Sequence, residues 1–259
     1  MRFSLLLLLL SACEVSDGTF SARHAASPRV DDQTWCTTIE LDNPSPIVAT
    51  EILAHFDAVD RVVIYRAAEG DVVGARDECS ELAQGAPLAI AKYSGDGLRL
   101  DAHGFSLAPR QRLRIEAQSS ERATGEIRID VEATHDPMAT PVEILEIDRD
   151  DVVLAPNQAG TASTFLTLPS ELAGARFVAF AAHTGKDGVA AQVATAASPT
   201  GDRILVHFTT AHRWTAPEVT TTPPTRIPDG GGIYVQCHYY NTSNDLSNEV
   251  CGAWAYFAP

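Results

Sequence analysis

The sequence predicts an all-β protein made of two tandem antiparallel β-sandwich domains of jelly-roll-like type. Short segments of alternating apolar and polar residues recur, as in "GLRLDAHG", "QRLRIEAQ" and "GEIRIDVEA". This alternation is typical of half-buried strands. Turn sequences such as "SGDG", "SPTGD" and "PDGGG" separate the strands, and no long helical period occurs. A chain of 259 residues with 45% hydrophobic content is long enough for two ordinary β cores.

The N-terminus carries the features of an export signal. "MRFSLLLLLLSAC" combines a basic residue, an apolar run too short to span a bilayer and small residues before a cysteine. The stretch from Leu10 to Cys13 resembles the lipobox of bacterial lipoproteins, which implies that residues 1–12 are removed and that Cys13 carries lipid. The alternative is an ordinary signal peptide with a chance cysteine. Glu14, rather than aspartate, follows the cysteine, and within this resemblance it favours the outer membrane of the bacterial cell envelope.

The rest of the chain divides into a tether and two domains. Residues 13–33 are small and polar without an apolar period, which predicts a tether. Two prolines in "THDPMATPVE" interrupt the strand pattern near the midpoint. We therefore expect one sandwich over residues 34–137 and a second over residues 138–259. The segments "RVVIYRA", "RFVAFAAH", "RILVHFT" and "IYVQCHYY" predict strands with two-sided burial.

The charge of the chain bears on its partners. The formal net charge is -15 and no basic run occurs, so we expect no nucleic-acid partner. Lipid on Cys13 would make the membrane a partner. The sequence does not identify any small molecule, peptide or protein that the chain would bind.

Four cysteines remain once Cys13 is assigned to lipid, and they allow three pairings. Exported proteins meet an oxidising compartment in which disulfides persist. Cys36 and Cys79 lie in the first half and Cys237 and Cys251 in the second, so one bridge within each half is the least entangled choice. A zinc site is the alternative, and the absence of a CxxC spacing disfavours it.

The C-terminal stretch "YVQCHYYNTSNDLSNEVCGAWAYFAP" resembles the end of the copper type II, ascorbate-dependent monooxygenases, such as the peptidylglycine α-hydroxylating and dopamine β enzymes. The matching residues are Cys237, Glu249, Cys251, Tyr256 and Pro259. Upstream, "FVAFAAHTGKDGVAAQV" is similar to that family's His-Thr-His strand and the turn after it. The segment that begins "CSELAQG" is similar to a part of the family's first domain. The resemblance covers residues 34–259.

The resemblance implies two copper sites, of which this chain retains one ligand. In the family a disulfide links the two strands of the C-terminal hairpin, next to a methionine that binds copper. Val250 stands at the position of that methionine. Of the two histidines that share this second site, His183 matches the first and Gly185 replaces the other. Soft thioether and imidazole ligands keep Cu(I) bound, so their loss removes the chemistry that copper needs.

The three-histidine site of the first domain is also lost. Its adjacent histidine pair falls on Asp60 and Arg61, and its third histidine falls near Ala117 and Gln118. We therefore expect a catalytically degenerate binding or surface lipoprotein, with no catalytic residues and no cofactor. The alternative is a copper-dependent monooxygenase with a reduced or rearranged site, supported by His183 and the hairpin clip.

One further metal site follows from an assumed strand register. If Cys237 and Cys251 face each other on neighbouring antiparallel strands, His238 lies opposite Val250 on the face away from the disulfide. His183 and His238 would then form a two-histidine site for copper or zinc. The alternative is two unrelated imidazoles on a solvated rim.

The other polar candidates are interpreted as structural. Lone histidines are more often hydrogen-bonded or exposed than metal ligands. Asp148, Asp150 and Asp151 predict a solvated turn rather than an acid/base pair or a calcium loop, because the glycine and spacing of such a loop are missing. Asn241, in "NTS", predicts turn chemistry rather than glycosylation. No GxSxG, HExxH or phosphate-binding loop motif occurs.

Overall fold

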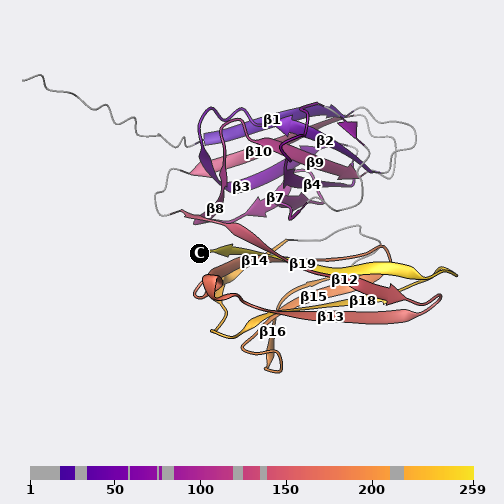
Figure 1. Ribbon diagram of the computed structural model, residues 1–259. Helices are drawn as coiled ribbons and strands as arrows, with labels where there is room; N and C mark the ends of the chain where they lie inside the picture. The colour runs from indigo at the N-terminus through magenta and orange to yellow at the C-terminus, as the bar shows by residue number, and fades with distance from the viewer. Residues whose placement is uncertain are drawn as a thin grey trace, which may run out of the picture.

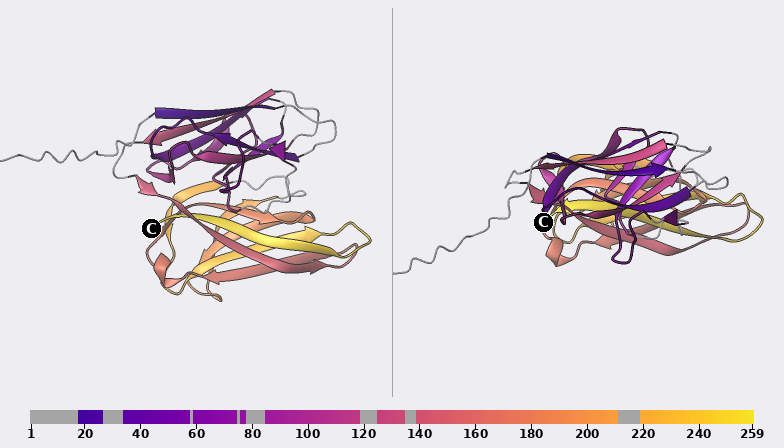
Figure 2. Two further views of the ribbon diagram at one scale, coloured as in Figure 1. Left: turned by 45° about the horizontal axis from the view of Figure 1, so that its top comes forward. Right: turned by 90° about the horizontal axis from the view of Figure 1, so that it is seen from above.

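The computed structural model describes residues 18–26, 34–57, 59–74, 76–77, 85–118, 125–134, 139–210 and 219–259. Its strands form two sandwiches, one stacked on the other (Figures 1 and 2). In the described ranges, one short 3₁₀ turn, η1 (Ser170–Leu172), is the only helical element. The predicted all-β fold with two tandem sandwiches is therefore confirmed. No helix among these residues is long and apolar enough to cross a membrane.

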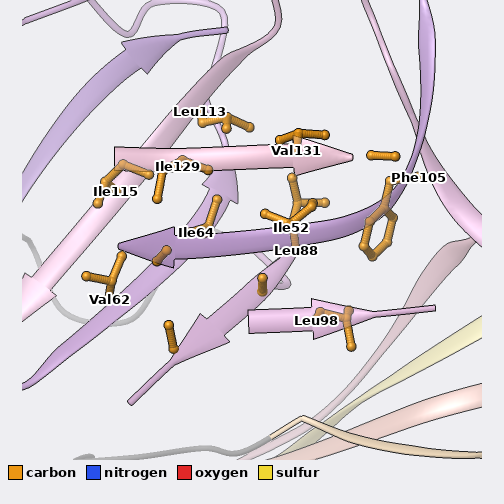
Figure 3. Close-up of a cluster of buried hydrophobic side chains, with 14 of the residues drawn as sticks. Ile52, Val62, Ile64, Leu88, Leu98, Phe105, Leu113, Ile115, Ile129 and Val131 are labelled. Carbon is orange, nitrogen blue, oxygen red and sulfur yellow. The ribbon is translucent and has the colours of Figure 1, made fainter. Parts of the chain in front are cut away.

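The first sandwich packs two sheets of strand order β1-β10-β3-β8-β11, with β7 also paired to β3, and β5-β2-β9-β4-β6. Its strands are β1 (Gly18–Ala26), β2 (Thr34–Glu40), β3 (Ile47–Phe56), β4 (Arg61–Arg66), β5 (Arg76–Asp77), β6 (Ala89–Ala91), β7 (Asp96–Arg99), β8 (His103–Leu107), β9 (Arg112–Gln118), β10 (Gly125–Thr134) and β11 (Thr140–Pro141). Alternate residues point inward, so Ile52 and Ile129 of one sheet meet Ile64 and Ile115 of the other (Figure 3).

Strand β1 corrects the predicted tether. Residues 13–33 were expected to be a tether, but Gly18–Ala26 pairs antiparallel with β10 along its whole length. Ala22 is buried, and Phe20 packs against the core. An edge strand is held largely by backbone hydrogen bonds, so this segment needs only a weak apolar pattern to join the sheet.

The second sandwich packs the sheet β12-β19-β14-β17 against β13-β18-β15-β16. Its strands are β12 (Glu143–Leu154), β13 (Ala159–Thr167), β14 (Arg176–Thr184), β15 (Gly188–Ala196), β16 (Arg203–Thr209), β17 (Thr220–Arg226), β18 (Gly232–Tyr240) and β19 (Ser247–Ala258). Strand β11 still pairs with β8 of the first sandwich, so the chain changes sandwich between Pro141 and Glu143. The boundary expected after residue 137 lies outside the described residues.

The predicted Cys237–Cys251 disulfide is confirmed, but it joins strands of opposite sheets. Cys237 lies in β18 and Cys251 in β19, with Cα atoms 5.6 Å apart, and both point into the sandwich core. The assumed antiparallel pairing of these two strands is wrong, because the connection between them crosses from one sheet to the other. Cys36, in β2, is also disulfide-bonded. Its expected partner Cys79 lies outside the described residues, as does Cys13.

Strand β16 differs from the expected two-sided burial of "RILVHFT". In the described part of the chain it pairs only with β15, at the edge of its sheet. Ile204, Leu205 and Phe208 are therefore exposed, while His207 and Thr209 point inward. A short apolar run cannot by itself distinguish a central strand from an edge strand.

The two sandwiches share one apolar cluster. Trp254 and Tyr256, on the face of β19 turned toward the first sandwich, belong to the same cluster as its core residue Phe105. The Tyr256 and Phe105 rings lie 6.2 Å apart, edge to face. The Tyr256 hydroxyl donates a hydrogen bond to the Pro87 carbonyl at 2.8 Å. Burial raises the pKa of Tyr256, so this hydroxyl keeps its proton. The interface is hydrophobic and fixed by a specific polar contact.

Candidate functional site

His183, the one copper ligand that the resemblance would retain, lies on the face of the second sandwich turned toward the first. Asp148 of β12, Gly252 of β19 and His183 of β14 stand side by side in register. A Cβ on Gly252 would overlap both Asp148 Oδ1 and His183 Nε2. Because Gly252 has no side chain, Asp148 Oδ1 and His183 Nε2 can approach each other to 2.9 Å above the central strand β19.

Trp254 completes the surroundings of His183. The two rings stack with centroids 4.3 Å apart and planes 19° apart. The His183 side chain is only 8% exposed, whereas that of Asp148 is 41% exposed. The Trp254 indole N–H donates to Glu146 Oε1 at 3.4 Å. The imidazole is thus held between an aromatic ring and a carboxylate.

The acidic segment around Asp148 is a strand rather than the predicted turn. Asp148, Asp150 and Asp151 all belong to β12, with an irregularity in its pairing between Arg149 and Val152. Arg149 pairs with Asp151 at 2.6 Å. The turn prediction failed because a bulged strand with an exposed face tolerates consecutive charged residues.

The structure does not bring His183 and His238 together. His238 lies in β18 of the other sheet, where its Nδ1 is 3.2 Å from the Thr161 hydroxyl. Since its neighbour Cys237 points into the core, His238 points out of the sandwich. His183 points out of the opposite sheet, so a two-histidine site does not form between them.

The residues at the second copper position do not fit copper. Gly185 stands where the resemblance places a histidine, and a Cβ there would overlap Glu249 Oε2. The carboxylate of Glu249 thus fills the space that the ligand would need. Among the described residues, no group of three or more histidines, cysteines, aspartates or glutamates could hold a metal ion. One imidazole is too few ligands for a copper site of this kind.

An ion pair lies where the resemblance places the first copper site. Arg61 Nη2 is 3.0 Å from Glu116 Oε1, with side chains 6% and 8% exposed. The Tyr65 hydroxyl is 3.5 Å from Glu116 Oε2. Burial, and next the Glu116 charge, raise the pKa of Tyr65. This buried cation at the expected metal position supports neither copper binding nor electron transfer.

The other histidines have structural surroundings where they are described. His55 pairs with Asp130 at 3.2 Å, and His207 Nδ1 lies 2.8 Å from the Thr220 hydroxyl. His24 lies beside Trp35, and His103 is buried in β8. His135 and His212 lie outside the described residues.

The prediction of turn chemistry at Asn241 is confirmed. Its side chain is fully buried and donates hydrogen bonds to Asp245 O at 2.9 Å and to Ala155 O at 3.1 Å. Its Oδ1 accepts from the backbone N–H of Ser243 at 2.8 Å. The amide therefore shapes the connection between β18 and β19.

Glu249 is a buried carboxyl beneath the turn that joins β14 and β15. It accepts hydrogen bonds from the Ser247 hydroxyl at 2.7 Å and from the Asp187 N–H at 3.3 Å. Burial raises its pKa above the ordinary 4.5, more than these hydrogen bonds lower it. The folded chain thus binds this proton more tightly than the unfolded chain. The stability that it contributes is present at acid pH and is lost as the pH rises through the raised pKa.

We expect Glu249→Gln to stabilise the chain at pH 7 by about 1 kcal/mol, because an amide is less costly to bury than a carboxylate. The gain should shrink toward pH 4.5, where the wild-type carboxyl is protonated. Urea unfolding across this pH range measures it, with the exposed Glu146→Gln as the charge-matched control. A gain that does not change with pH would show that folding does not raise the pKa of Glu249.

Two cavities open between the sandwiches. The larger, about 390 Å³, is lined by Arg66, Leu88 and Phe105 of the first sandwich and by Val142, Glu143 and Ile144 at the start of the second. The other, about 250 Å³, includes Arg99, Asp101, His103 and Thr222 in its lining. Arg66 and Glu143 were missed by sequence reasoning because they lie far apart in the chain and belong to no motif.

Comparisons with known proteins show likeness in fold only. No family model and no curated protein matches this chain. The major capsid protein P2 of bacteriophage PM2 is 9% identical over 93% of this chain and 97% of that chain, with a TM-score of 0.41. VP2 of infectious bursal disease virus, in a subviral particle, is 8% identical over 94% of this chain and 72% of that chain, with a TM-score of 0.26. At these TM-scores the likeness carries no argument about what this chain does.

Proposed function

We propose that this chain is an exported, lipid-anchored binding protein of the bacterial cell envelope. It would use the copper type II monooxygenase scaffold without the family's copper chemistry, and it would bind its partner in the cleft between the sandwiches. The observation that carries the proposal is that protein side chains occupy both expected copper positions. Arg61 pairs with Glu116 at one, and Glu249 fills the space beside Gly185 at the other.

The interface between the sandwiches supports a binding role. Ligand sites are commonly concave, largely apolar and placed between domains, with a few polar groups for orientation. The larger cavity combines Leu88, Phe105 and Ile144 with two charged side chains. The shared apolar cluster and the Tyr256 to Pro87 hydrogen bond hold its walls in place.

Copper loading tests the proposal. We expect the full chain, incubated with copper under reducing conditions and then desalted, to retain no stoichiometric copper in elemental analysis. Restoring the family's ligand in Gly185→His should not restore binding, and it should cost about 1–3 kcal/mol, because the new side chain overlaps Glu249. The Gly185→His/Glu249→Ala variant provides the matched control in which that space is free. Near-stoichiometric copper in the wild type that is lost in His183→Ala would instead favour the monooxygenase.

Membrane anchoring has a separate test. If Cys13 is lipidated, Cys13→Ser should move the protein from the detergent phase to the aqueous phase, because acyl chains supply the membrane affinity. Metabolic labelling with a fatty acid should label the wild type and not the variant. Unchanged partitioning would contradict the lipid anchor and leave an ordinary signal peptide.

A further inference from the structure

The larger cavity between the sandwiches carries two opposite charges on an apolar surface. Arg66 comes from the end of β4 and Glu143 from the start of β12, while Leu88, Phe105 and Ile144 supply apolar lining. A volume of about 390 Å³ falls within the roughly 300–1,000 Å³ of small-molecule sites. The cavity is therefore large enough for a small organic molecule.

Neither charge has an ion-pair partner among the described residues. Arg66 donates one hydrogen bond, from Nη1 to the Ser106 carbonyl at 2.9 Å, and forms no ion pair there. Glu143 forms no ion pair there either, so the two do not neutralise each other. Other arginines of the first sandwich do pair with glutamates, namely Arg61, Arg99 and Arg110.

Arg66 lies at the exposed end of β4, so its guanidinium is accessible to a ligand. Burial of part of the side chain lowers the pKa of Arg66. A guanidinium also presents several N–H donors in a planar arrangement that matches both oxygens of a carboxylate. Glu143, on the same cavity, would repel a simple carboxylate and attract an ammonium group.

We propose that this cavity binds an apolar amino acid in its zwitterionic form. Arg66 would take the carboxylate, Glu143 the ammonium, and the lining around Phe105 the side chain. The inference rests on the proposed binding role and specifies its ligand class. A ligand carrying both charges neutralises both unpaired side chains, whereas a lone acid or a lone amine satisfies one and is repelled by the other.

Isothermal titration of the full chain tests the inference with L-phenylalanine, L-leucine, phenylacetate and phenethylamine. We expect L-phenylalanine or L-leucine to bind with one site per chain. Phenylacetate, which lacks the ammonium, and phenethylamine, which lacks the carboxylate, should bind at least about tenfold more weakly than L-phenylalanine. Arg66→Gln and Glu143→Gln should each lower the affinity for L-phenylalanine about tenfold, the loss expected from one charged hydrogen-bond contact. Circular dichroism checks that both variants remain folded.

Arg99→Gln is the matched control, because Arg99 lines the smaller cavity and pairs with Glu51. It removes the same charge from the same sandwich and should leave L-phenylalanine binding unchanged. The inference is overturned if neither amino acid binds, if phenylacetate binds as tightly as L-phenylalanine, or if Arg99→Gln weakens binding as much as Arg66→Gln. Copper retention that depends on His183 would overturn the proposed function separately, whatever the amino acids do.

Discussion

Arg61→Met is expected to destabilise the chain by about 3–5 kcal/mol, because it leaves the Glu116 carboxylate buried without its cation. Glu116 is 7% exposed, and among the described residues it also lies 3.5 Å from the Tyr65 hydroxyl. That neutral contact cannot replace a guanidinium at 3.0 Å. Urea unfolding at pH 7 measures the loss.

Two variants separate the buried charge from the loss of a large side chain. Arg61→Met/Glu116→Leu removes both charges and should recover most of the stability, since well-packed apolar residues often replace a buried ion pair without loss. Arg23→Met breaks the exposed Arg23–Glu126 pair, whose side chains are 60% and 52% exposed, and should cost less than about 1 kcal/mol. If Arg61→Met lowers the free energy of unfolding no more than Arg23→Met does, the Arg61–Glu116 ion pair does not stabilise the first sandwich.

Trp254→Ala is expected to cost about 3–5 kcal/mol, the usual loss for a buried tryptophan. Trp254 is 2% exposed, belongs to the apolar cluster that spans both sandwiches, and stacks on His183. Its removal leaves a cavity at the interface and exposes the imidazole to water. Urea unfolding followed by circular dichroism measures the loss.

Two control variants test whether the loss of stability comes from the buried ring. Trp254→Phe retains an aromatic ring in the cluster and should lose clearly less stability than the alanine variant. Phe208→Ala removes a ring that is 53% exposed on β16, so it should change stability by less than about 0.5 kcal/mol. A cost below about 1 kcal/mol for Trp254→Ala would mean that the interface does not depend on this side chain.

The fold class, most strand positions and one disulfide could be predicted from the sequence. The alternation in "QRLRIEAQ" and "GEIRIDVEA" predicted β9 and β10, because neighbouring side chains of a strand point to opposite faces and the pattern is local. The pairing of Cys237 with Cys251 followed from their shared half of the chain.

Which strands become neighbours could not be predicted from the sequence. Local alternation does not encode the partner of a strand, which depends on the packing of the whole sheet. For this reason β18 and β19 were predicted to pair, whereas they lie in opposite sheets with His238 and His183 on opposite outer faces. The contact of His183 with Asp148 across Gly252 likewise joins residues distant in the chain, and so does the placement of Arg66 and Glu143 on one cavity. Such arrangements exist only after the sheets and the two sandwiches have packed.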